Sequence, residues 1–273
     1  MGKFDGILIC TDLDGTIYKR DKTVSKENKD AIEYFKREGG YFTFITGRLP
    51  HYSNNAYENI IPNAPYGCVN GGGVYDGEAE KYVWTLPIDK RVHELVGFIC
   101  ERFAGVGVQV CTFDNTYFAR DNEANLRFRE ITGVPYLPCR YEEINEPLAK
   151  IIFATLVEDE ILGIDKALRS HELADRFEFV RSERSLYEIL PKGVNKGLAL
   201  DKLVEWLGVS GEKTVAIGDY DNDIGMLKTA GVGVAVANAS PKAKEAADVI
   251  TVSNEEHAIA QVIYDIESGK IVF

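Results

Sequence analysis

Two clusters of carboxylates, far apart in the sequence, each begin where a short apolar run ends. Asp12 and Asp14 follow the run at 7–10, and Asp219 follows the run at 214–217. Runs of this kind are typical of strands that are buried on both faces of a parallel sheet. Thr46 follows a third run, at 41–45. Because open parallel sheets bind ligands just outside the carboxyl ends of their strands, we expect these polar side chains to lie together.

Helices alternate with apolar strands on both sides of these clusters. The segment 25–38 has apolar residues at helical spacing, with Ser25 as the predicted N-cap. The same alternation resumes at Gly193 and continues to a predicted strand at 249–252 and a final helix. The pattern predicts an α/β fold with a doubly wound, Rossmann-like parallel sheet at its centre.

The rhythm changes between residues 83 and 187. Helices and strands follow in the order αββαβαββ, and tight turns such as that at 114–115 imply antiparallel pairing of consecutive strands. We therefore predict an inserted α+β cap domain at 83–187 and a core domain formed by 1–82 and 188–273. The cap is expected to close over the crevice and determine which substrate is accepted.

Composition narrows the classes of partner. The formal net charge of −12 argues against nucleic acid, whose binding depends on Lys and Arg displacing counterions. No apolar stretch approaches the roughly 20 residues that span a bilayer, and the N-terminus does not resemble a signal peptide. The five cysteines form no Cys-x-x-Cys pair, as is typical of a reducing compartment. We expect a soluble, cytoplasmic protein that binds neither nucleic acid nor membranes; its oligomeric state is open.

The first cluster suits phosphoryl transfer. Asp12 can attack phosphorus to give an aspartyl phosphate, and Asp14 can protonate the leaving oxygen and later take a proton from water. Thr46 and Gly47 offer a hydroxyl and an amide to phosphate oxygens. Lys196, near the start of a predicted helix, can offset charge in the transition state. These residues predict a site for a small anionic substrate.

Oxygen ligands at the same place predict a magnesium site. The carboxylates of Asp12 and Asp219 are the hard ligands that Mg²⁺ prefers. Asn222 and Asp223 fall in the first turn of the next helix, where an amide can donate to phosphate and an acid can orient its neighbours. We therefore place Asp223 behind the residues that contact metal or substrate.

These segments together resemble the haloacid dehalogenase superfamily, and most closely its Cof-like phosphatases. The resemblance covers the whole chain and rests on the turn Asn70-Gly71-Gly72 and on four motifs: Asp12-Leu13-Asp14-Gly15-Thr16, Thr46, Lys196, and Gly218-Asp219 with Asn222 and Asp223. It implies that Asp12 is the nucleophile, Asp14 the acid/base and a metal ligand through its backbone carbonyl, and Asp219 a metal ligand. It also implies phosphate contacts by Thr46, Lys196 and Asn222.

The resemblance implies a hydrolase rather than other members of that superfamily. Its transporting ATPases and dehalogenases have no acid at the position of Asp14. A magnesium-dependent phosphatase of small phosphorylated metabolites, such as sugar phosphates or nucleotides, is therefore expected. The alternatives are a non-catalytic regulatory protein that binds a phosphorylated metabolite, and a phosphomutase. Arg48 and His51 are open to either a pocket or a surface position.

Overall fold

The computed structural model describes residues 2–273, apart from the side chain of Asn54. Backbone contacts divide the chain into two compact units. The first contains the residues up to Arg48, Ser53–Thr85 and Asn195–Phe273, and the second contains Leu49–Tyr52 and Leu86–Val194. Within the described residues, the apolar helices are all too short to cross a membrane.

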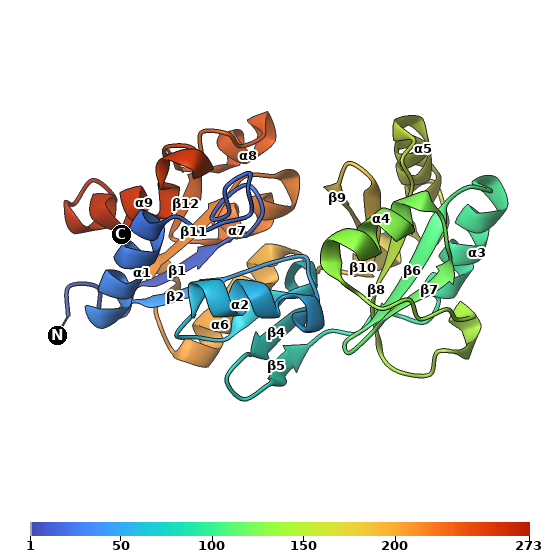
Figure 1. Ribbon diagram of the computed structural model, residues 1–273, viewed down its shortest axis with the longest axis horizontal. Helices are drawn as coiled ribbons and strands as arrows, with labels where there is room; N and C mark the ends of the chain where they lie inside the picture. The colour runs from blue at the N-terminus through green and yellow to red at the C-terminus, as the bar shows by residue number, and fades with distance from the viewer. Residues whose placement is uncertain (1) are drawn as a thin grey trace. The chain divides into compact units, whose positions relative to one another are not determined.

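The first unit has a parallel sheet at its centre and a small antiparallel sheet beside it (Figure 1). Its strands are β1 (Leu8–Thr11), β2 (Tyr41–Phe44), β3 (Tyr66–Cys68), β4 (Gly73–Asp76), β5 (Lys81–Thr85), β11 (Thr214–Gly218), β12 (Val232–Ala235) and β13 (Val249–Ile250). Its helices are α1 (Lys26–Arg37), α2 (Asn54–Ile60), α6 (Lys196–Leu207), α7 (Ile224–Thr229), α8 (Pro241–Ala246) and α9 (Ala258–Glu267).

The central sheet has the strand order β13-β12-β11-β1-β2, and every neighbouring pair is parallel. All residues of β1 and β11 are buried, as their apolar runs predict. The register pairs Thr11 with Ile217, so both strands end at the same level. This confirms the predicted doubly wound α/β core.

The point where the winding reverses lies between β1 and β11. From β1 the chain crosses through α1 to β2 on one side, and from β11 it crosses through α7 to β12 on the other. Because such crossovers are right-handed, α1 and α7 lie on opposite faces of the sheet. The carboxyl ends of β1 and β11 therefore flank the topological switch point, where open sheets bind ligands.

Local sequence signals account for α1. The Ser25 side chain accepts a hydrogen bond from the Asn28 backbone N–H, as expected of an N-cap, and Ala31, Ile32 and Phe35 are buried. Helix α1 packs beside α9. By contrast, α2 and the hairpin of β4 and β5 have no counterpart in the sequence prediction.

The second unit is a five-stranded antiparallel sheet of order β7-β6-β8-β10-β9 with three helices. Its elements are α3 (Val92–Arg102), β6 (Gly107–Thr112), β7 (Thr116–Arg120), α4 (Glu123–Thr132), β8 (Leu148–Ala154), α5 (Glu158–Arg169), β9 (Phe177–Glu183) and β10 (Leu186–Pro191). They follow the predicted order αββαβαββ. Apolar residues of the sheet pack with α3 and α5 in one core. The role of this segment as a specificity cap stays a prediction.

Candidate active site

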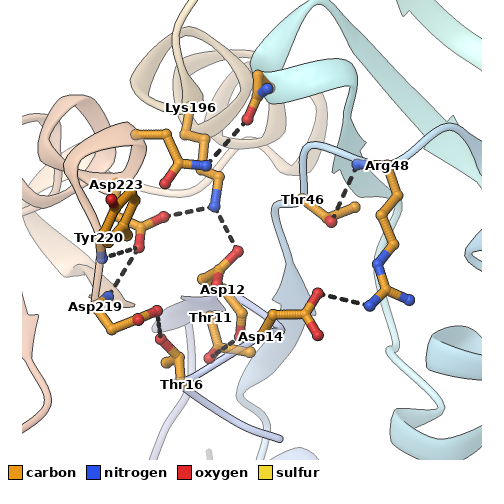
Figure 2. Close-up of polar contacts among 12 residues, drawn as sticks. Thr11, Asp12, Asp14, Thr16, Thr46, Arg48, Lys196, Asp219, Tyr220 and Asp223 are labelled. Carbon is orange, nitrogen blue, oxygen red and sulfur yellow. Dashed lines mark hydrogen bonds and ion pairs between the residues drawn. The ribbon is translucent and has the colours of Figure 1, made fainter. Parts of the chain in front are cut away.

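Asp12 and Lys196 form the centre of the site. Asp12 follows β1 directly, and its backbone N–H donates to the Ile217 carbonyl at 2.8 Å. Lys196 opens α6 behind Asn195, whose side chain accepts from the N–H groups of Gly197 and Leu198. The ammonium of Lys196 is buried and lies 2.5 Å from Oδ1 of Asp12 (Figure 2). The structure therefore brings together the predicted nucleophile and the predicted lysine.

Asp223 connects this centre to the end of β11. Its Oδ1 accepts from Lys196 at 2.5 Å, while its Oδ2 accepts from the backbone N–H groups of Asp219 and Tyr220 at 2.8 and 2.9 Å. The fully buried carboxylate of Asp223 thus fixes both the lysine and the loop that carries Asp219. The sequence predicts an orienting role for Asp223, and that role stays a prediction.

Three carboxylates lie close together at this place, and two of them, Asp12 and Asp223, accept from the ammonium of Lys196. Asp12, Asp219 and Asp223 each offer an oxygen, and these oxygens lie within 4.8 Å of one another. Burial and the neighbouring acids raise the pKa of Asp12 well above its ordinary value. Burial and Asp223 raise the pKa of Asp219 to about 6. An all-oxygen donor set with surplus negative charge fits a hard divalent cation.

The loop after Asp14 is shaped to fit Asp219. Gly15 has φ of +85°, and a Cβ built there would lie 2.5 Å from Oδ2 of Asp219. Thr16 donates from its hydroxyl to Oδ1 of Asp219 at 2.8 Å. Asn238 donates from its side chain to the Gly15 carbonyl at 2.8 Å. The glycine is therefore required both by its backbone angle and by the approach of the carboxylate.

A second loop, residues 46–48, holds the predicted phosphate donors. The Arg48 backbone N–H donates to Oγ1 of Thr46 at 3.2 Å, and the Asn70 N–H donates to the Thr46 carbonyl at 3.0 Å. A Cβ at Gly47 would lie 3.0 Å from Oδ1 of Asn70. Asn222 donates to the same oxygen at 3.2 Å. Asn70 thus connects the Thr46 loop to Asn222.

Asp14 points away from the other carboxylates. Its Oδ2 accepts from Nη2 of Arg48 at 2.6 Å and its Oδ1 from Nζ of Lys22 at 2.8 Å. Figure 2 shows this carboxylate directed toward Arg48 rather than toward Lys196. Although burial alone would raise the pKa of Asp14, the two cations hold it below its ordinary value.

Several side chains that contact the site have no role predicted from the sequence, among them Thr16, Lys22, Arg48, Asn70 and Asn238. Thr16 and Asn70 are part of the segments on which the resemblance rests, but their residue types alone do not predict which groups they bind. Lys22 is a surface lysine in a turn, for which no sequence signal exists. Arg48 joins the site, whereas His51 lies in the segment Leu49–Tyr52 of the second unit.

Known proteins resemble this chain in sequence and in fold over nearly their whole length. The haloacid dehalogenase-like hydrolase family matches residues 9–263. The 5-amino-6-(5-phospho-D-ribitylamino)uracil phosphatase YitU of Bacillus subtilis is 31% identical, over 94% of this chain and 96% of that protein. The structure of a haloacid dehalogenase-like hydrolase from Bacteroides thetaiotaomicron matches with a TM-score of 0.83 at 24% identity, over 95% of this chain and 99% of that protein. A haloacid dehalogenase-like hydrolase from B. subtilis has a TM-score of 0.82 at 26% identity, over 94% of this chain and 98% of that protein.

Proposed function

Because this chain belongs to the haloacid dehalogenase-like hydrolase family, as one of its phosphatases, we propose that it hydrolyses its substrate through an aspartyl phosphate on Asp12 with the help of Mg²⁺. The observation that supports this most directly is the contact between Lys196 and Asp12. A buried ammonium 2.5 Å from a carboxylate can draw a phosphate dianion to that carboxylate.

The residues around Asp12 would each assist this reaction. Lys196, Thr46 and Asn222 would hold the phosphate oxygens. Asp12 would form a bond to phosphorus while the ester bond breaks, and Asp14, once protonated, would give its proton to the leaving oxygen. A divalent cation held by Asp12 and Asp219, with the Asp14 backbone carbonyl, would supply positive charge between phosphate and carboxylate. Asp223 keeps Lys196 and the Asp219 loop in place.

The substrate is a small phosphorylated metabolite. The B. subtilis relative is named for a phosphate ester of a ribitylamino-uracil. We propose that ester as the first to test, beside sugar phosphates and nucleotides. The expected compartment is the cytoplasm, and all five cysteines are free thiols in the described residues.

A panel of phosphate monoesters tests the proposal. Release of inorganic phosphate is expected with Mg²⁺, and it should stop in excess chelator and be suppressed by Ca²⁺, which prefers larger and looser coordination. Full turnover in chelator would exclude the metal. Recovery of an isomeric phosphate ester in place of inorganic phosphate would identify a phosphomutase, and binding without turnover a regulatory protein.

The second unit is proposed to select the ester. Substitutions within residues 83–187 should change relative kcat/KM among esters far more than they change the rate on p-nitrophenyl phosphate. The same loss on every substrate would contradict this role, and so would rapid dephosphorylation of folded phosphoproteins.

A further inference from the structure

The direction of the Asp14 carboxylate is fixed by cations outside the carboxylate cluster. Arg48 and Lys22 bind its two oxygens at 2.6 and 2.8 Å. An acid/base must reach the oxygen that it serves. The group that aims Asp14 therefore bears on the reaction even if it never contacts the substrate.

Arg48 is itself held firmly by the backbone. Its N–H donates to Oγ1 of Thr46, and its carbonyl accepts from the Val69 N–H at 3.0 Å. Its side chain is 31% exposed, and its guanidinium stays charged at any ordinary pH. The predicted phosphate loop thus carries a fixed cation that is directed at Asp14.

Lys22 is the weaker of the two partners. It adopts φ of +62° in a turn that the Lys19 N–H closes on the Thr23 carbonyl, a conformation that few non-glycine residues take. Its side chain is 65% exposed, so water and salt screen its attraction for Asp14. Arg48 should therefore contribute more than Lys22 to the orientation of the Asp14 carboxylate.

We propose that Arg48 is the positioning residue for Asp14 and fixes the direction of its carboxylate for hydrolysis of the aspartyl phosphate. The inference rests on the proposed roles of Asp12 and Asp14. In the hydrolytic step, Asp14 takes a proton from water, the water oxygen bonds to phosphorus, and the bond from phosphorus to Asp12 breaks. Phosphate is released and both carboxylates are restored once Asp14 gives up its proton.

The two half-reactions depend on Asp14 unequally when the ester is p-nitrophenyl phosphate. p-Nitrophenolate is a stable anion that leaves without a proton, so the first step needs little help from Asp14. Hydrolysis of the aspartyl phosphate still needs a base to take the water proton. Loss of Arg48 should therefore slow the second step selectively.

Rapid mixing of Arg48→Gln with p-nitrophenyl phosphate and Mg²⁺ tests this. The expected result is a burst of about one p-nitrophenolate per chain at a rate within about threefold of the wild type, followed by turnover reduced roughly 10²-fold, at the low end of acid/base contributions. Arg48→Lys, which keeps the charge but not the planar fork, should recover part of the turnover.

Matched variants separate this role from others. Lys22→Gln should reduce turnover by only about threefold, as its exposed pair is weak. Lys26→Gln, which removes an exposed partner of Asp30 on α1, should change nothing. Thermal unfolding of each variant checks that it folds.

Three outcomes would overturn the proposal. Equal losses of burst rate and turnover, with weaker inhibition by inorganic phosphate, would make Arg48 a phosphate ligand. A burst amplitude that falls in proportion to turnover would show that only the fraction of folded protein has changed. Unchanged kinetics would leave Arg48 without a role. A wild-type protein that hydrolyses no ester would instead refute the proposed function itself.

Discussion

The ammonium of Lys196 lies 2.5 Å from Oδ1 of Asp12 and 2.5 Å from Oδ1 of Asp223, although the two carboxylates follow different strands. Burial lowers the pKa of Lys196, but the two acids outweigh it and hold the pKa above its ordinary value. The lysine therefore stays charged, and it balances part of the negative charge that the switch point gathers.

Replacing Lys196 with Met should destabilise the fold and abolish turnover. It leaves buried carboxylates without their cation, and breaking such a pair costs about 3–5 kcal/mol. Denaturant unfolding in chelator measures the loss. The matched control is Lys202→Met on the same helix, whose side chain pairs with exposed Glu205 and should change the unfolding free energy by less than about 1 kcal/mol. Equal stability of the two variants would contradict the charge argument.

The two carboxylates of the first motif should fail differently. Asp12→Asn removes the nucleophile, so turnover should be lost and beryllium fluoride should no longer be held as an aspartyl adduct. Asp14→Asn should keep phosphate binding, and it should still form some aspartyl phosphate from esters with good leaving groups. Near-normal turnover by the Asp12→Asn protein would show that the nucleophile is assigned wrongly.

Without metal, the protein should lose stability as pH rises through about 6. The pKa of Asp219 is near 6 in the folded chain, against an ordinary 3.8, so the folded state binds this proton more tightly than the unfolded state. The resulting stabilisation is fully present below about pH 4 and is lost as pH rises through 6. Thermal unfolding in chelator should show this fall in stability with pH. The fall should be smaller when Mg²⁺ replaces the chelator, and smaller in the Asp219→Asn protein. A curve in Asp219→Asn as steep as the wild type would exclude Asp219 as its source.

Gly15→Ala should weaken metal binding beyond its cost to the backbone. Gly6 is a matched control, since it also has positive φ, +76°, but a Cβ there meets nothing within 4 Å. Backbone strain should destabilise both variants by about 1–2 kcal/mol. Only Gly15→Ala pushes a methyl group against Asp219. Calorimetric titration with Mg²⁺ should show weaker binding for Gly15→Ala alone, and equal affinities would mean that the close approach does not matter.

The sequence predicts the parts of this site that follow from strand and helix order. The runs before Asp12, Thr46 and Asp219 mark strand ends, and parallel order brings those ends together. The direction of a side chain is harder to predict from the sequence. The sequence places Asp14 two residues after Asp12, but the direction of its carboxylate is set by Arg48 and Lys22, whose contacts depend on the folded loops.

Element boundaries show the same limit. Within 83–187, the sequence pattern predicts a helix at 160–174. The structure has this helix at Glu158–Arg169, because the chain leaves the helix at Ser170 and forms a short 3-10 turn at Ala174–Arg176. The sequence also predicts a helix at 196–207, and the observed helix has the same two ends, since Asn195 caps its start and Gly208, with φ of +67°, ends it. Strong local caps are readable from sequence, whereas ends set by packing are not.

The last prediction concerns a buried ion pair in the second unit. Lys150 on β8 lies 2.8 Å from Oε2 of Glu188 on β10, and both side chains are nearly fully buried in the second unit. Burying two charges is less favourable than burying an apolar pair of similar size, while removing one partner deprives the other buried charge of this ion pair. Lys150→Met should therefore destabilise the protein by about 3–5 kcal/mol, and the double variant Lys150→Met with Glu188→Leu should recover most of that loss. Denaturant unfolding of both variants and of the wild type gives the comparison. If the double variant is as unstable as the single one, the pair supports the fold through contacts other than its charge. If it regains stability but loses discrimination among esters, the pair serves recognition.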